Sequence, residues 1–293
     1  MPSILVAGAT GTQGGAVVDA LTSGEYGEFT VYGLTRDKES DAAAALSDRG
    51  VVVVEGDMTD EDRMAALCTG MDGVFVVTTP YEDGVPTELE QGRVLINAAA
   101  DAGAHVVFTS AAGSFYQIGV PFIDSKHVVE QNCYNREMRR TIVRPAYFMQ
   151  NLEAMAEEIR EGELALPLAP DARMDLVDAT DVGRFAAMAF ADPDAFDQKT
   201  FELAGEALTL EQMADALSET LGRDVEAVHL DPTDYEVRDE LGKDVLKLFQ
   251  WFNEDDYPVN VDAIERRFGV RPRAFADYLA DGEAWRPAPA PTR

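Results

Sequence analysis

The sequence predicts an α/β protein in which a doubly wound parallel sheet is followed by a smaller, interdigitated α/β lobe. In the first half of the chain, short apolar runs alternate with alanine- and acid-rich stretches at helical spacing. A run such as the valines at 51–54 suits a strand that is covered on both faces. This alternation stops after Pro145. We therefore expect a first domain over residues 1–150, a smaller lobe over 151–282 and a disordered tail over 283–293.

Each expected strand of the first domain is a short apolar run, and each expected helix carries apolar residues three or four positions apart. Strands are expected at residues 4–7, 29–34, 51–55, 73–78, 105–109 and 141–143. Helices are expected at residues 16–21, 38–46, 61–68, 87–102 and 124–138. In such a sheet, ligands bind beyond the carboxyl ends of the strands where the strand order reverses. The residues just after each strand are therefore the informative ones.

The second half has a less regular pattern. Thr180 or Asp181 is expected to cap a helix that follows residue 178, and Thr209 to cap a later one. Prolines alternate with other residues after Trp285, and because proline has no backbone N–H, this segment can join neither a β-ladder nor a helix. Disorder is therefore predicted in the tail. The other elements expected here are helices at 148–160, 239–251 and 274–279 and strands at 200–203 and 224–230.

A glycine turn directly follows the first expected strand. Gly8, Gly11 and Gly14 are spaced as G-x-x-G-x-x-G, with Thr10, Thr12 and Gln13 between and beside them. A strand, a glycine turn and a helix N-terminus in this order form a site for a pyrophosphate, because the N–H groups and the helix dipole favour an anion. The alternative is an ordinary loop. Its position between a strand and a helix favours dinucleotide binding.

Composition limits the class of protein. A chain of 293 residues can bury a large core, and no apolar run reaches the length of a membrane span. No signal peptide precedes the first strand, so we expect a cytoplasmic protein without a membrane partner. Cys68 and Cys133 lie in apolar helical patterns, which predicts buried thiols rather than a disulfide framework. The three histidines are scattered, so no metal site is expected.

The charge balance is strongly acidic, with 54 acidic and 24 basic residues and a formal net charge of −30. The acidic residues are spread over the whole chain, which favours an acidic surface adapted to a halophilic cytoplasm over an acidic binding arm. Direct nucleic-acid binding is not expected of such a surface. A dinucleotide is itself anionic, so the few well-placed cations become candidate ligand contacts. Lysine is scarce: Lys38, Lys126, Lys199, Lys243 and Lys247.

Two strand ends carry candidates for the adenosine half of a dinucleotide. Arg36 and Asp37 end the second strand, where this fold reads the ribose. Asp37 would prefer a free 2′-hydroxyl, and Arg36 would pair with a 2′-phosphate. Arg36 is the first of the two residues after the strand, which favours NADP as the cofactor, with NAD as the alternative. A surface ion pair between Arg36 and Asp37 that binds no cofactor is the other interpretation. Asp57 and Met58 follow the third strand and could contact the adenine, although Asp57 could equally cap a helix.

The later strand ends carry candidates for the reactive half. Thr78 and Thr79 end the fourth strand, beside the expected nicotinamide ribose, although a plain turn explains them equally well. Ser110 ends the fifth strand. Lys126 follows on a helix and could bind ribose hydroxyls or donate a proton; alternatively it pairs with Glu130 at i,i+4 spacing. The next strand leads into Pro145, Ala146, Tyr147 and Phe148, for which core packing is the competing explanation.

Taken together, these segments resemble the NmrA-like family, an atypical branch of the short-chain dehydrogenase/reductases with an NAD(P)-binding Rossmann domain. The resemblance is carried in order by residues 8–15, 34–36, 57–58, 124–126, 144–151 and 178–184. It implies that Gly8, Thr10, Gly11, Gln13 and Gly14 cradle the pyrophosphate and that Arg36 meets the adenosine phosphate. It also implies that Asp57 and Met58 flank the adenine, that Lys126 reaches the nicotinamide ribose, and that residues 145–148 border the nicotinamide.

One position departs from the wider reductase family. The proton-donating tyrosine of its Tyr-x-x-x-Lys pattern is replaced by Phe122, four residues before Lys126. Two functions then remain open. The first is an NAD(P)H-dependent oxidoreductase acting on a small carbonyl, quinone or enone, with Lys126, Ser110 or Tyr147 orienting the substrate or supplying the proton. The second is a non-catalytic NAD(P) redox sensor that acts through a protein partner; a homodimer is compatible with either.

Overall fold

The computed structural model describes residues 1–234, 241–254 and 259–285. They form two compact units. The first comprises Met1–Pro145 and Ala179–Glu202, and the second comprises Ala146–Asp178 together with the described residues from Leu203 onward. The chain thus leaves the first unit after Pro145 and returns to it for residues 179–202, whereas the sequence predicts a first domain over residues 1–150 and an interdigitated lobe over 151–282.

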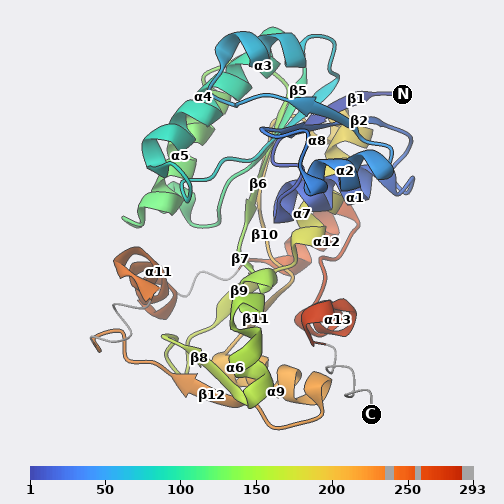
Figure 1. The fold of residues 1–293 in the computed structure, drawn as a ribbon. Coiled ribbons are helices and arrows are strands. Elements are labelled where there is room, and N and C mark those ends of the chain that lie inside the picture. The colour runs from blue at the N-terminus through green and yellow to red at the C-terminus, as the bar shows by residue number, and fades with distance from the viewer. Residues whose placement is uncertain (235–240, 255–258, 286–293) are drawn as a thin grey trace. The chain divides into compact units, whose positions relative to one another are not determined.

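The first unit contains a seven-stranded sheet in the order β10-β6-β5-β4-β1-β2-β3. Strands β1 to β6 pair in parallel, and the strand order reverses between β1 and β4. Figure 1 shows helices α3, α4 and α5 on one face of this sheet and α1, α2 and α7 on the other. The strands are β1 (Ser3–Val6), β2 (Thr30–Thr35), β3 (Val52–Glu55), β4 (Gly73–Val76), β5 (His105–Thr109), β6 (Arg140–Pro145) and β10 (Lys199–Leu203). The doubly wound α/β prediction is therefore confirmed.

The helices of the first unit follow their strands as expected. They are α1 (Thr12–Thr22), α2 (Asp41–Asp48), α3 (Glu61–Cys68), α4 (Gly84–Asp101), η1 (Ser114–Tyr116), α5 (Pro121–Tyr134), α7 (Ala179–Ala191) and α8 (Pro193–Phe196). Helix α2 begins three residues later than expected, because the Ser40 hydroxyl accepts from Ala43 N and sets its start. Helix α7 begins at Ala179, so Thr180 and Asp181 lie in its first turn and the prediction that one of them caps it is wrong.

The core of the first unit lies on both sides of the sheet. Strands β4 and β5 are buried along their whole length, as a sheet covered on both faces requires. Helix α7 packs closely on α1, since a Cβ added to Gly183 would lie 2.2 Å from the carbonyl oxygen of Ala16. Cys68 and Cys133 are buried thiols without a disulfide, as predicted, and burial raises the pKa of each to about 12.

The second unit contains a three-stranded sheet in the order β11-β9-β7 and a parallel pair, β12 and β8. Its strands are β7 (Tyr147–Phe148), β8 (Glu163–Leu166), β9 (Met174–Val177), β11 (Glu206–Leu208) and β12 (Glu226–His229). Its helices are η2 (Met149–Met155), α6 (Ala156–Glu161), α9 (Leu210–Leu221), α11 (Lys243–Glu254), α12 (Val261–Phe268), α13 (Phe275–Asp281) and η3 (Glu283–Trp285). The predicted cap at Thr209 is confirmed: its hydroxyl accepts from Gln212 N, and Gln212 Oε1 accepts from Thr209 N.

Several expectations for this unit were wrong. The single helix expected at 148–160 is a short strand, a 3₁₀ segment and a one-and-a-half-turn helix. Residues 283–285 were expected in the disordered tail but form η3, and Trp285 is buried against Tyr278. Residues 239–240 of one expected helix and residues 286–293 of the tail lie outside the described residues. None of the helices within the described ranges is both long and apolar enough to cross a membrane.

Candidate functional site

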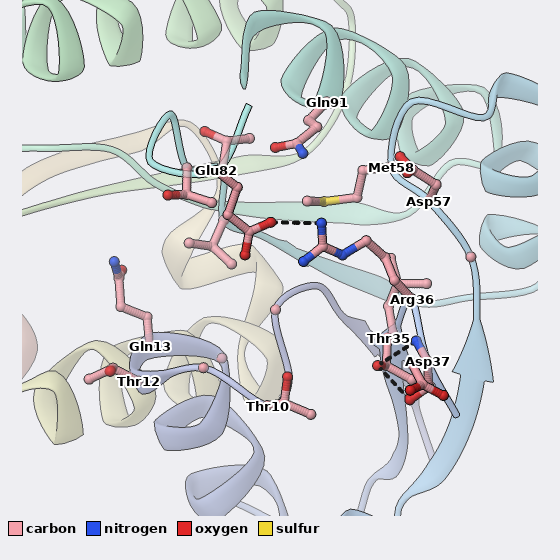
Figure 2. Close-up of a pocket in the computed structure, with 18 residues that line it drawn as sticks. Thr10, Thr12, Gln13, Thr35, Arg36, Asp37, Asp57, Met58, Glu82 and Gln91 are labelled. Carbon is pink, nitrogen blue, oxygen red and sulfur yellow. Dashed lines mark hydrogen bonds and ion pairs between the residues drawn. The ribbon is translucent and has the colours of Figure 1, made fainter. Parts of the chain in front are cut away.

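A cavity of about 480 Å³ lies at the carboxyl ends of strands β1 to β4 in the first unit. This volume lies in the range typical of ligand pockets, and the strand order reverses here between β1 and β4. Figure 2 shows the side chains that line it. The structure brings together here most of the predicted cofactor residues: Gly8, Thr10, Gly11, Thr12, Gln13, Gly14, Arg36, Asp57, Met58, Thr78 and Thr79. Glu82 and Gln91 also line it and were not predicted.

Two glycines allow the turn after β1 to pack against its surroundings. Gly8 has φ +60°, and a Cβ there would lie 2.7 Å from Val77 Cγ1. A Cβ on Gly14 would lie 2.1 Å from the carbonyl oxygen of Gly8. Because a real Cβ does not approach backbone this closely, only glycine allows α1 to begin beside the strand end.

The first turn of α1 forms the floor of this cavity. Gly11 precedes the helix and supplies no capping side chain, and Gly11 to Gly14 all line the cavity. An uncapped helix start of this kind offers N–H groups and a positive dipole end to an anion. Gln13 is held in place because Thr109 Oγ1, at the end of β5, donates to Gln13 Oε1 at 2.6 Å. The turn can therefore bind a phosphate group.

At the other end of the cavity, Arg36 pairs with an acid that the sequence did not reveal. Arg36 Nη1 lies 2.6 Å from Glu82 Oε2, and Figure 2 shows the pair joined. The side chains are 59% and 54% exposed. Hydrogen bonding to Glu82 raises the pKa of Arg36 above its ordinary value. The alternative of an Arg36–Asp37 surface pair is not observed; instead Asp37 Oδ1 accepts from Glu39 N at 2.9 Å.

Asp57 and Met58 line the cavity directly after β3. Asp57 Oδ1 accepts from the backbone N and the hydroxyl of Thr59, at 2.8 and 2.7 Å, and these bonds lower the pKa of Asp57. Asp57 is not the helix cap, because Asp60 Oδ1 accepts from Arg63 N at the start of α3. Asp57 therefore carries its charge at the edge of the cavity.

Lys126 joins a buried network beside Thr78. Its Nζ lies 2.6 Å from Glu88 Oε1, and it also donates to the carbonyl oxygen and, at 3.1 Å, to the hydroxyl of Thr78. Glu88 is completely buried and accepts from Ser125 Oγ at 2.6 Å and from Thr78 Oγ1 at 3.1 Å. Burial lowers the pKa of Lys126, and Glu88 opposes this shift. Lys126 does not line the cavity itself but contacts Thr78, which does.

Glu130 forms a second buried network instead of pairing with Lys126. Arg144 binds it with two hydrogen bonds, Nε to Oε1 at 2.8 Å and Nη2 to Oε2 at 2.6 Å. Ser110 Oγ and Ser114 Oγ both donate to Glu130 Oε1. Ser110 is buried and is absent from the cavity lining. The hydroxyl expected at the reactive end is thus bonded to an internal carboxylate.

The remaining predicted residues lie along the chain where the first unit ends, at Pro145, and the second begins, at Ala146. Pro145 ends β6 in the first unit, where its carbonyl oxygen accepts from Ala112 N at 2.9 Å. Tyr147 and Phe148 form β7 in the second unit, and Tyr147 contacts Phe249 and Phe252 edge-on. In the described part of the chain, no group of three or more histidine, cysteine or acidic residues could hold a metal ion.

A model of the NmrA-like family matches residues 2–281. The chain belongs to the NmrA-like family. This NmrA-like protein is 35% identical over 231 residues to the NAD(P)H azoreductase of Xenophilus azovorans, an alignment that covers 77% of this chain and 76% of that relative. The NmrA-like family, predicted from the sequence segments that occur in its order along the chain, is therefore confirmed.

Solved structures show the same fold. The triphenylmethane reductase of Citrobacter sp., complexed with NADP(H), matches with a TM-score of 0.79 at 20% identity and covers 95% of this chain and 99% of that one. NmrA, a negative transcriptional regulator in complex with NADP, matches with a TM-score of 0.77 at 21% identity and covers 96% and 94%. At these identities the likeness establishes the architecture of the NmrA-like chain, which agrees with the predicted Rossmann fold.

Proposed function

We propose that this NmrA-like protein is an NADPH-dependent oxidoreductase that reduces a small carbonyl, quinone or enone, with NADH as the alternative cofactor. The observation that carries the proposal is the cavity after β1, where an uncapped helix start and Arg36 lie at the ends of one pocket. Pyrophosphate would bind the first turn of α1, and a 2′-phosphate would bind Arg36. A relative named as an NAD(P)H azoreductase supports this and adds an azo bond to the candidate acceptors.

The bound cofactor would supply the hydride. Lys126, held by Glu88 and Thr78, fixes the end of β4 beside the expected nicotinamide ribose and keeps a positive charge there. Ser110, which follows β5, donates to Glu130 in the second buried network. Since both groups are bonded to buried carboxylates, we assign them to positioning. Tyr147 is the candidate proton donor, and Pro145 and Phe148 are proposed to border the nicotinamide.

The test measures loss of reduced nicotinamide absorbance with a panel of small quinones, enones, aldehydes and azo dyes. We expect turnover with wild type, a loss of about 10²-fold or more in Tyr147→Phe if Tyr147 donates the proton, and weaker NADPH binding in Lys126→Met. Lys199→Met is the matched control, because Lys199 begins β10 and does not line the cavity. Turnover retained in Tyr147→Phe would remove Tyr147 from the mechanism.

A non-catalytic redox sensor gives a different result. It would bind NADPH or NADH tightly and consume neither across the whole panel. Failure of both nucleotides to bind wild type, measured by titration calorimetry, would contradict both functions and the assignment of the cavity.

A further inference from the structure

The charged residues that line the cavity are mostly acidic. They are one cation, Arg36, and three carboxylates, Asp37, Asp57 and Glu82. An NADPH molecule would bring a further phosphate dianion to the Arg36 end, whereas NADH would bring none. The balance of charge around Arg36 therefore affects the two cofactors unequally.

Among these carboxylates, Glu82 is the one bonded to Arg36. Asp57 Oδ1 accepts from Thr59, and Asp37 Oδ1 accepts from the backbone N of Glu39. Glu82 Oε2 lies 2.6 Å from Arg36 Nη1, in the loop between β4 and α4. Figure 2 shows the carboxylate reaching the guanidinium from the opposite side of the pocket, with Met58 beside them. Glu82 thus occupies the Nη1 donor of Arg36, which a 2′-phosphate would also use.

We propose that Glu82 is a specificity-determining residue that lowers the preference for NADPH over NADH by competing with the 2′-phosphate for Arg36. This inference rests on the proposed function, because it requires that the cavity binds a nicotinamide dinucleotide with its adenosine ribose near Arg36. When NADPH binds, Arg36 must leave Glu82 or share its donors, and Glu82 then faces a phosphate of like charge. NADH needs neither change. Because the Arg36–Glu82 pair is exposed, its effect on the preference is about two- to fivefold.

The experiment measures dissociation constants of NADPH and NADH by titration calorimetry for wild type, Glu82→Gln and Asp83→Asn. In Glu82→Gln we expect NADPH to bind about two- to fivefold more tightly and NADH binding to stay unchanged, which also shows that the site is intact. Asp83→Asn is the matched control. It removes the same charge from the next residue, which does not line the cavity, and the ratio of the two constants should shift less than in Glu82→Gln.

A second comparison tests whether Glu82 acts through Arg36. In an Arg36→Ala background, we expect Glu82→Gln to retain about half or less of its effect on NADPH binding, since the two residues are in contact. An undiminished effect in that background would overturn competition for Arg36. If wild type binds both nucleotides and Glu82→Gln leaves their ratio unchanged, the inference fails and the proposed function stands. If wild type binds neither, both fail.

Discussion

Glu88 Oε1 lies 2.6 Å from Lys126 Nζ, and this ion pair joins α4 to α5 at the end of β4. The Glu88 side chain has no exposed surface, and that of Lys126 is 12% exposed. Thr78 and Ser125 supply the other hydrogen bonds to the carboxylate. A buried carboxylate is tolerated only with such partners, so the four side chains act as one unit.

Replacing Glu88 by glutamine should destabilise the fold strongly. The substitution leaves the Lys126 ammonium buried without its counter-charge, which costs about 3–5 kcal/mol in the free energy of unfolding. Glu90→Gln is the matched control on the same helix, because the Glu90 side chain pairs with Arg93 while remaining 43% exposed, so its loss should cost far less than that of Glu88. Chemical denaturation of both variants gives the two values, and equal losses would contradict a buried pair.

The same variant should have an altered pH dependence. Burial lowers the pKa of Lys126 below 10.5, and removing Glu88 removes the interaction that opposes this shift. Between the lowered folded pKa and 10.5, the unfolded chain binds more protons than the folded one, so stability rises with pH in this window. The deficit of Glu88→Gln relative to wild type should therefore be largest below the window and shrink as the pH approaches 10.5. A deficit that is constant with pH would show that Lys126 stays charged.

The glycine turn can be tested with an isosteric pair of substitutions. A Cβ at Gly11 would meet only the Gly8 carbonyl oxygen at 3.4 Å, and its φ of −95° suits any residue. Gly11→Asp and Gly11→Asn should therefore both fold. Asp adds a negative charge where the phosphates are proposed to bind, so we expect NADPH affinity to fall about tenfold or more below that of the Asn variant. Equal affinities of the two variants would contradict a phosphate site here.

A structural role of Ser110 can be distinguished from a catalytic one by measuring both stability and turnover. Its hydroxyl donates to Glu130, which keeps its bonds to Arg144 and Ser114 when Ser110 is replaced by alanine. We expect Ser110→Ala to lose about 1 kcal/mol of unfolding free energy and kcat to change little. Ser114→Ala is the matched control, since its hydroxyl is also buried and bonds the same oxygen. A fall of about 10²-fold in kcat with stability unchanged would instead make Ser110 a catalytic residue.

The net charge of −30 predicts that stability depends on salt. Repulsion among surface carboxylates is screened as the Debye length shortens from about 10 Å at 0.1 M to about 3 Å at 1 M. We therefore expect the Tm to rise with KCl mainly below about 1 M and then level off. A Tm that rises steadily to higher salt, as with excluded solutes such as sucrose, would indicate a general solvent effect rather than screening of the surface carboxylates.

The cavity could be predicted from sequence because its parts are local. The spacing of Gly8, Gly11 and Gly14 after an apolar run sets both the turn and the helix start. Arg36 directly follows β2, and Asp57 lies two residues after the end of β3. A parallel sheet places such residues at one edge, so no knowledge of distant contacts is needed. The architecture of the first unit could be predicted in the same way, from the alternation of strand and helix patterns along the sequence.

The roles of three acids, the exposed Glu82 and the buried Glu88 and Glu130, could not be predicted. Glu82, Glu88 and Glu130 are three of 54 acidic residues, and nothing adjacent to them in sequence distinguishes them. Their roles arise from partners brought close by the fold, such as Ser125 for Glu88, which is 37 positions away. The helix expected at 148–160 also depended on local pattern alone, whereas pairing of β7 with β9 determines the structure there.

The return of α7 to the first unit has a consequence for synthesis on the ribosome. Gly183 packs on the backbone at Ala16, yet some 30 residues of the other unit are translated before it emerges. During synthesis, the face of α1 that α7 covers therefore stays exposed until the last part of the first unit, residues 179–202, has left the exit tunnel. A fragment that stops at residue 145 lacks α7 and leaves this face of α1 uncovered, so we expect it to aggregate. A circular permutant that places residues 179–202 ahead of residue 1 contains the whole first unit in one chain.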